Sequence, residues 1–153
     1  MSEKVFGGFK IEKASILISD LRGFTYFTEK YPSLEVTDLL NRYFNIMIPI
    51  IVKNGGVVDK LIGDSILAIF EFKNDDLNNV LTCAIEMQNA MNQINSKNIE
   101  MDMPSIHMGI GINTGDVAVG YLGNISHHDF TVIGNEVNLA AGLKHIVCVV
   151  KFC

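Results

Sequence analysis

The sequence predicts an α+β fold in which helices pack on one face of an antiparallel sheet. Short apolar runs alternate with two long stretches whose apolar residues recur at i, i+3, i+4 and i+7, the spacing of a buried helix face. One run, residues 105–113, instead alternates apolar residues with His107 and glycines, as in a half-buried strand. With 153 residues, the chain is expected to form one domain, residues 1–153, that buries a core without disulfides.

A strand and a long helix are predicted first. Residues 14–19 form an apolar strand. The helix is expected to have Ser33 as its N-cap and to stop at residues 54–56, Asn-Gly-Gly. Pro49 has no backbone N–H, so we expect it to kink the last turns or to end the regular helix early. The apolar face of this helix comprises Val36, Leu39, Leu40, Tyr43, Phe44, Met47, Ile50 and Ile51.

A hairpin and a second long helix are predicted in the middle of the chain. Residues 57–60 and 65–70 form two short apolar strands around residues 61–64. The second helix extends from about residue 76 to residue 95. Its apolar face comprises Leu77, Val80, Leu81, Ala84, Ile85, Met91 and Ile94.

The last predicted elements are three strands and a short helix. Residues 105–113 form the first strand, Gly115 is expected to break the chain, and residues 117–122 form the second. A third strand covers residues 129–133, and a helix is expected from about residue 135 to residue 144. The resulting order, strand-helix-strand-strand-helix followed by these last elements, is typical of a ferredoxin-like (palm-like) α+β sheet with its helices on one face.

Composition excludes several classes of partner. The formal net charge is −5 and Lys and Arg do not cluster, so we expect no nucleic-acid partner. The longest apolar runs, residues 46–52 and 146–150, are far shorter than the roughly 20 residues that span a bilayer, so we expect no membrane segment. The three cysteines, Cys83, Cys148 and Cys153, form no disulfide or zinc pattern, which favours a cytoplasmic location, and Cys83 is expected to be buried.

Two aspartates with glycines nearby point to nucleotide chemistry. Asp20 follows the first strand and precedes Gly23-Phe24-Thr25, and Asp64 lies in the predicted hairpin. Carboxylates at strand ends can hold divalent cations against a triphosphate, and a negative protein needs such cations to bind a polyanion. Backbone N–H groups in a glycine-containing turn can bind phosphate oxygens. Taken alone, Asp20 is better explained as a residue that forms a turn at the end of a strand.

Four motifs follow one another along the chain: SDLRGFT at residues 19–25, GGVVDKLIGD at 55–64, GIGINTGDVAVG at 109–120 and DFTVIGNEVNLAA at 129–141. In order and spacing they resemble the class III nucleotidyl cyclase catalytic domain, the domain of adenylyl and guanylyl cyclases, and most of all that of bacterial adenylyl cyclases. The resemblance covers residues from about 14 to 144.

The resemblance implies conversion of ATP or GTP to the 3′,5′-cyclic monophosphate and pyrophosphate, for intracellular signalling. The 3′-hydroxyl attacks the α-phosphorus in line, and two Mg²⁺ or Mn²⁺ ions per site acidify that hydroxyl and hold the leaving phosphates. By resemblance, Asp20 and Asp64 are the metal-binding carboxylates, and the Leu21 carbonyl is a further ligand. The turn at residues 23–25 is expected to contact the substrate phosphates.

Base recognition is expected from Lys60 and Thr131. The family has lysine at the position of Lys60 in adenylyl cyclases and usually glutamate in guanylyl cyclases. A lysine donates hydrogen bonds, which suits N1 of adenine, and the Thr131 hydroxyl can accept from the adenine amino group. The resemblance therefore implies ATP as substrate. Asn138 matches the asparagine that contacts the ribose, and we assign it a catalytic role on that resemblance.

The chain departs from the family pattern at Gly142. The family has an arginine four residues after the position of Asn138, and its guanidinium neutralises charge on the phosphates in the transition state. The C-terminus is also short relative to the family. Three alternatives to an active adenylyl cyclase therefore stay open. The first is a catalytically impaired homologue that binds nucleotide or regulates by dimerising. The second is a diguanylate cyclase, although its Gly-Gly-Asp-Glu-Phe signature is missing, and the third is a domain with only a binding or structural role.

Assembly is implied by the same resemblance. In this family the active site forms between two subunits, the metal-binding aspartates coming from one and the base-reading lysine and the asparagine from the other. We therefore expect a homodimer with two equivalent sites related by a two-fold axis. A sensor or regulatory domain attached in a larger parent protein would also be typical of the family.

Overall fold

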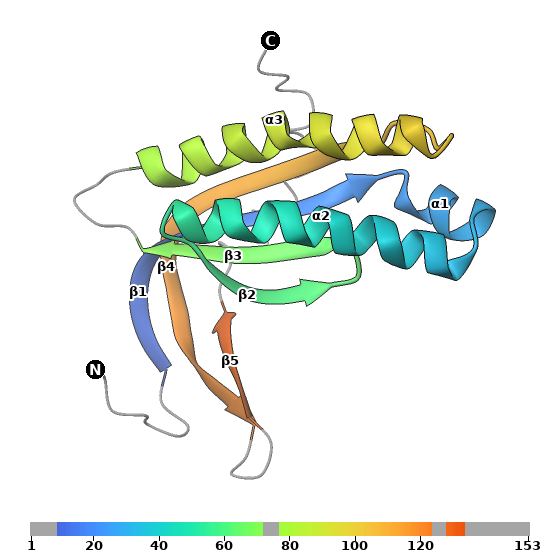
Figure 1. Cartoon of the computed structure of the whole chain (residues 1–153). Coiled ribbons are helices and arrows are strands. Elements are labelled where there is room, and N and C mark those ends of the chain that lie inside the picture. The colour runs from blue at the N-terminus through green and yellow to red at the C-terminus, as the bar shows by residue number, and fades with distance from the viewer. Residues whose placement is uncertain (1–8, 72–76, 124–127, 134–153) are drawn as a thin grey trace.

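The computed structural model describes residues 9–71, 77–123 and 128–133 (Figure 1). Within these residues an antiparallel sheet has the strand order β2-β3-β1-β4-β5. The elements are β1 (Phe9–Arg22), α1 (Phe24–Lys30), α2 (Ser33–Lys53), β2 (Val57–Ile62), β3 (Ser65–Glu71), α3 (Asn78–Glu100), β4 (His107–Gly123) and β5 (His128–Ile133).

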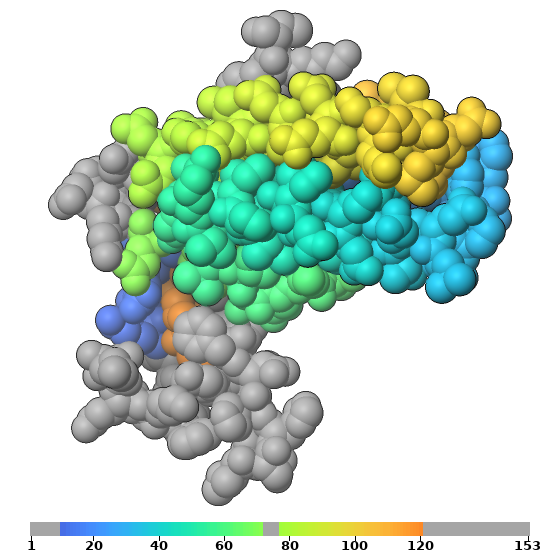
Figure 2. Space-filling model, in the orientation of Figure 1, coloured from blue at the N-terminus to red at the C-terminus, as the bar shows by residue number. Residues whose placement is uncertain are grey.

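The two long helices lie side by side on one face of the sheet (Figures 1 and 2). Their positions between β1 and β2, and between β3 and β4, give the predicted ferredoxin-like arrangement of strands β1 to β4, and β5 extends the sheet beside β4. Among the described residues, no helix is long and apolar enough to cross a membrane.

Hydrophobic residues are buried on both faces of the sheet. Odd-numbered residues of β1, such as Leu17 and Leu21, pack against the helices, and even-numbered residues, such as Ile16 and Ile18, pack on the other face. The cluster on the second face consists of Ala14, Ile16, Ile18, Leu67 and Val117, with Ile69 and Val119 packed against it. Cys83, on α3, is fully buried, as predicted, and burial raises the pKa of its thiol to about 12.

The predicted break at Gly115 is wrong, because β4 runs without interruption from His107 to Gly123. It pairs with β1 from Arg22 back to Phe9, so the whole stretch has backbone partners that hold it extended through the glycine. Both β1 and α3 are longer than predicted, and α1 was not foreseen as a helix of its own. The helix predicted at residues 135–144 lies outside the described residues.

Two expectations about α2 also differ from the structure. Ser33 is the first helical residue and not the N-cap, a position that Pro32 occupies without a side-chain hydrogen bond. The helix continues past Pro49 to Lys53 and does not end early. Pro49 and Asn45, whose carbonyl loses its usual partner, both lie on the exposed side of the helix, where water can satisfy that carbonyl.

The predicted stop after α2 is confirmed as a Schellman motif. Asn54 is the C-cap and Gly55 adopts φ 86°, a left-handed conformation that suits glycine. The Gly55 N–H donates to the Val52 carbonyl at 3.0 Å, and the Gly56 N–H donates to the Ile51 carbonyl at 2.9 Å. These bonds turn the chain sharply, so that β2 returns along the sheet directly beneath α2.

The Gly56→Ala variant should be destabilised, because a Cβ at this position would lie 2.6 Å from Phe70 Cζ and 2.8 Å from Ile51 Cγ2. Forcing an extra methyl group into a packed core typically costs about 1–3 kcal/mol. Urea denaturation of the two chains measures the loss. In a Phe70→Leu background the same substitution should cost less, and an equal cost in both backgrounds would show that the ring is not the obstacle.

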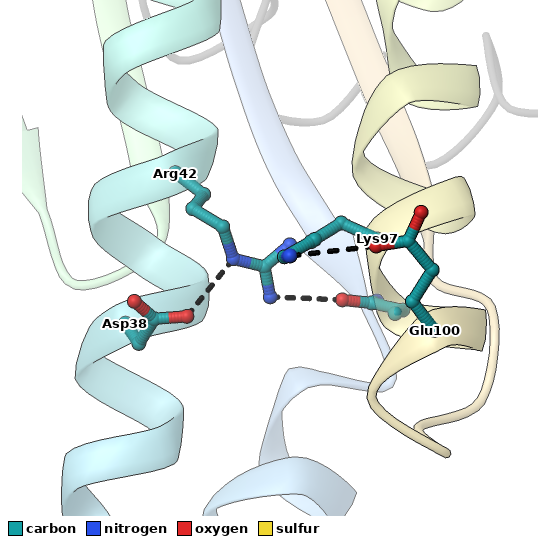
Figure 3. Close-up of polar contacts among 5 residues, drawn as sticks. Asp38, Arg42, Lys97 and Glu100 are labelled. Carbon is teal, nitrogen blue, oxygen red and sulfur yellow. Dashed lines mark hydrogen bonds and ion pairs between the residues drawn. The ribbon is translucent and has the colours of Figure 1, made fainter.

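A polar cluster links α2 to α3 near the end of α3 (Figure 3). The Arg42 guanidinium donates through Nη2 to Asn98 Oδ1 and through Nε to Asp38 Oδ2, both at 3.0 Å. Asn98 is fully buried and also donates through Nδ2 to the Pro104 carbonyl at 3.3 Å. On the outer side of α3, Lys97 pairs with Glu100. The cluster fixes the two helices against each other and holds the chain that leads into β4.

Candidate active site

In the structure, the Asp64 carboxylate contacts Leu21, the residue that follows Asp20. Ile62 pairs with Ser65, so Gly63 and Asp64 form a two-residue hairpin loop, and Gly63 has φ 58°. The loop reaches β1, where the Leu21 N–H donates to Asp64 Oδ2 at 2.8 Å. Residues that are 43 positions apart in the sequence are therefore joined at one end of the sheet. A carboxylate has a second oxygen, so this bond still leaves Asp64 a possible metal ligand.

Asp20 lies on the face of the sheet that the helices leave uncovered. It follows the alternation of Ile16 and Ile18, and its neighbour in register on β4 is Gly109. Because glycine has no Cβ, β4 places no side chain directly beside this half-buried carboxylate. The arrangement provides two carboxylates, one from β1 and one from the β2–β3 loop, near the same strand end.

Ser19 and Tyr43 form a buried hydrogen-bonded pair beneath this strand end. The two hydroxyl groups lie 3.0 Å apart, and both side chains are fully buried. The Tyr43 hydroxyl also donates to Met108 Sδ at 3.2 Å, so Ser19 is the donor toward Tyr43. This chain of contacts ties α2, β1 and β4 together one residue before Asp20.

The charges of both aspartates reach Tyr43. Burial is the largest cause that raises the pKa of the Tyr43 hydroxyl, the hydrogen bond with Ser19 lowers it, and the negative charges of Asp64 and Asp20 raise it further. The hydroxyl therefore stays protonated far above neutral pH. The protonated hydroxyl contributes its full stability to the fold at pH values below about 10, the pKa of free tyrosine. That contribution is lost as the pH rises through the raised pKa of the folded state.

The Tyr43→Phe variant is expected to lose about 1–3 kcal/mol of unfolding free energy at pH 7, because it leaves the buried Ser19 hydroxyl without its acceptor. Chemical denaturation measures this loss. The double variant Ser19→Ala/Tyr43→Phe should recover part of it, since both partners are then apolar. Additive losses in the double variant would contradict the proposed pairing.

The turn predicted to contact phosphates begins α1. Gly23 is its N-cap, with a left-handed φ of 72°, and its carbonyl accepts from the Tyr26 N–H at 3.0 Å. Thr25 is exposed and Phe24 is half-buried against the core. The turn follows Asp20 and Leu21 at the strand end where Asp64 lies, so the structure gathers the predicted metal-binding and phosphate-binding residues in one region.

Lys60 and Thr131 lie on the two edge strands of the sheet, β2 and β5. The sheet curves, so that β2 and β5 contact each other although three strands separate them in the sheet order (Figure 1). Lys60 is paired in register with Leu67, and Thr131 with Gly120. The strands that carry the two predicted base-reading residues are therefore brought together within one chain.

Two further residues of the predicted site, Asn138 and Gly142, lie outside the residues that the structure describes. Within residues 9–71, 77–123 and 128–133, no three His, Cys, Asp or Glu side chains gather as a metal site, and the predicted site uses only two carboxylates.

Sequence reasoning missed the roles of Ser19 and Tyr43, and it missed the ion pair between Asp59 Oδ2 and Lys60 Nζ. A tyrosine in the apolar stripe of a helix was the available signal for Tyr43, because a buried phenol needs a partner. For Asp59 the signal was a carboxylate directly before a lysine in a strand whose other residues are apolar. Ser19 gave no comparable signal before the strand faces were known.

Comparison with known proteins decides the family. Residues 9–146 match the family described as the adenylate and guanylate cyclase catalytic domain. The chain belongs to this family. It is 37% identical over 142 residues, 90% of the chain, to an adenylate cyclase of Anabaena cylindrica, and 37% identical over 149 residues, 94% of the chain, to the terminal-differentiation specific adenylate cyclase of Dictyostelium discoideum.

Solved structures of cyclases share the fold. The guanylyl cyclase Cya2 is 36% identical, with a TM-score of 0.84, and the match covers 91% of this chain and 72% of that one. The adenylyl cyclase CyaB from P. aeruginosa is 32% identical, with a TM-score of 0.85, and the match covers 91% of this chain and 74% of that one. This cyclase domain spans only 28% of the Anabaena protein and 7% of the Dictyostelium protein.

Proposed function

We propose that this cyclase domain converts ATP to 3′,5′-cyclic AMP and pyrophosphate at a site formed between two copies of the chain. The observation that carries the proposal is the hydrogen bond from the Leu21 N–H to Asp64, which holds the Asp64 carboxylate at the residue that follows Asp20. Both carboxylates belong to motifs that resemble those of the family. Relatives of comparable identity are named adenylate and guanylyl cyclases, so the choice of ATP depends on Lys60.

The two carboxylates supply hard oxygen ligands that suit Mg²⁺ or Mn²⁺. Divalent cations held there would lower the pKa of the attacking hydroxyl and neutralise the leaving phosphates. The chain's own contribution is to fix Asp64 through Leu21 and to support β1 through Ser19, so that both acidic groups are positioned before substrate binds. Asn138 would orient the ribose, and the Leu21 carbonyl would complete the ligand set.

The proposed selectivity for adenine over guanine rests on which groups of each base donate or accept hydrogen bonds. Lys60 offers only donors, which complement the N1 acceptor of adenine, and the Thr131 hydroxyl can accept from the adenine amino group. Guanine carries an N–H donor at N1, so the ammonium group opposes it. The contact between β2 and β5 supports a joint role for these two residues.

A homodimer is proposed because the site draws on both copies. Asp20 and Lys60 would then act in different sites of a two-fold pair, each chain contributing to both. Activity per chain should fall on dilution below the dimer dissociation constant. Activity per chain that stays constant to the lowest concentration, where analytical ultracentrifugation shows only monomer, would contradict the shared site.

A second candidate is an impaired homologue that binds nucleotide without efficient turnover. Gly142, at the position of the family arginine, favours it. This candidate shares the nucleotide site and differs only in rate, so binding and turnover must be measured separately. A cytoplasmic location and an attached regulatory domain remain predictions from the sequence.

The experiment that tests the proposal measures cyclic AMP and cyclic GMP formation from ATP and GTP, side by side, with Mn²⁺. We expect cyclic AMP in clear excess and less preference in the Lys60→Glu variant. A preference for GTP in the unmodified chain would overturn the substrate assignment. Tight ATP binding without detectable turnover would favour the impaired homologue.

A further inference from the structure

We propose that Asp59 is a positioning residue for nucleotide selectivity, because its buried carboxylate holds the Lys60 ammonium group where it reads the base. The inference rests on the proposed function, in which Lys60 recognises adenine. It concerns a residue to which the family resemblance assigned no role.

A β-bulge places the side chains of Asp59 and Lys60 on the same side of the strand. Val58 pairs with Ala68, but Lys60 pairs with Leu67, so two steps along β2 match one step along β3. In a regular strand, neighbouring side chains point to opposite faces, and Lys60 would then lie opposite Ile66 on the helix side. The extra residue, Asp59, reverses this alternation for the rest of the strand.

The bulge turns Lys60 toward the face that carries Asp20. Its partner Leu67 belongs to the hydrophobic cluster on the face away from the helices, and Leu67 pairs in turn with Ile18. Asp20 follows Ile18 on that same face of β1. Val58, before the bulge, still packs against the core under the helices. One inserted residue thus lets β2 partly bury Val58 on one side and present Lys60 on the other.

The ion pair fixes the lysine once it faces this side. Lys60 Nζ lies 3.3 Å from Asp59 Oδ2, and the Asp59 side chain is 1% exposed whereas that of Lys60 is 38% exposed. A buried carboxylate is unfavourable without a countercharge, so Asp59 favours the conformation in which Lys60 stays beside it. The ammonium group remains partly accessible and retains donors for a ligand.

This pairing bears on selectivity and not only on affinity. An ammonium group on a flexible four-carbon side chain can move to donate to different acceptors, including O6 of guanine. An ammonium group held by Asp59 is restricted to one position, where an acceptor such as N1 of adenine is favoured and an N–H donor is not. Outer partners that orient a binding side chain typically change affinity by about 10–100-fold.

The test measures binding of non-hydrolysable ATP and GTP analogues with Mn²⁺ by calorimetry, which does not depend on turnover. We expect Asp59→Asn to lower the ATP-over-GTP preference by about tenfold, within the range typical of outer partners. Asp59→Glu, which keeps the charge, should retain much of the ATP-over-GTP preference. In a Lys60→Met background, Asp59→Asn should cause no further loss. Asp38→Asn, which removes a carboxylate from another ion pair on α2, is the matched control and should leave the preference unchanged.

The outcomes separate this inference from the proposed function. If Lys60→Met lowers the preference but Asp59→Asn does not, the lysine reads the base without help and the inference is overturned. An equal loss from Asp59→Asn with and without Lys60 would also overturn it, because the effect would then be structural. If the unmodified chain binds neither analogue, or if Lys60→Met leaves the preference intact, the proposed function itself fails, and the inference fails with it.

Discussion

The Asp64→Asn variant is expected to lose cyclase activity by at least about 10²-fold while remaining folded, since removing one preorganised electrostatic contact typically costs about 10²–10³-fold in kcat. An asparagine oxygen can still accept the hydrogen bond from the Leu21 N–H, so the hairpin loop should keep its place on β1. The variant lacks the negative charge that a divalent cation requires. Turnover of ATP with Mn²⁺ and thermal unfolding, measured on the same preparation, separate the two effects.

Asp38→Asn serves as the control for this variant, because Asp38 lies on α2 in the helix layer and is 54% exposed. It should retain full activity. Both substitutions are also assayed in a Gly142→Arg background, so that the loss is measured against the higher turnover expected there. Full activity in Asp64→Asn would contradict a metal-binding role for this carboxylate.

The Gly142→Arg variant is expected to raise turnover by about 10²–10³-fold, because removing one hydrogen-bond donor to the transition state typically lowers kcat by that factor. In other phosphoryl-transfer enzymes, an arginine finger raises kcat by about 10³–10⁵-fold. The gain expected here is smaller than most of that range. A guanidinium group four residues after Asn138 on a helix would lie on the same helix face as that residue. The initial rate of cyclic AMP formation measures the gain.

Gly142→Ala separates charge from helix stability in this experiment. Glycine costs roughly 1 kcal/mol relative to alanine in a helix interior, so part of any gain in activity can come from the helix alone. We expect Gly142→Ala to raise stability with little change in rate. Equal gains from alanine and arginine would show that Gly142 limits the fold and not the transition state.

The arrangement of the sheet could be predicted from the sequence because period-2 and period-3.6 patterns are strong in this chain. The alternation of Met108 and Ile110 with glycines predicted a strand with one apolar side, and in the structure both residues pack in the cluster under the helices. Element ends were less predictable, since they depend on tertiary partners. The continuity of β4 through Gly115 is set by pairing with β1, a contact that no local pattern in β4 contains.

The candidate site was predictable where motifs mark single residues, and unpredictable where neighbouring elements position them. Asp20 and Asp64 could be selected from their motifs, but the hydrogen bond that joins Asp64 to Leu21 depends on how the hairpin folds against β1. The bulge at Asp59 could not be predicted either, because register is a property of two strands and a single strand sequence does not fix it.

The central claim is that Asp20 and Asp64 hold divalent cations against a nucleoside triphosphate. Anomalous X-ray scattering from crystals of the chain grown with Mn²⁺ and a non-hydrolysable ATP analogue tests it most directly. We expect manganese peaks within coordination distance of both carboxylates, with the triphosphate beside the turn at residues 23–25. A bound nucleotide whose manganese ions contact neither aspartate would contradict the claim.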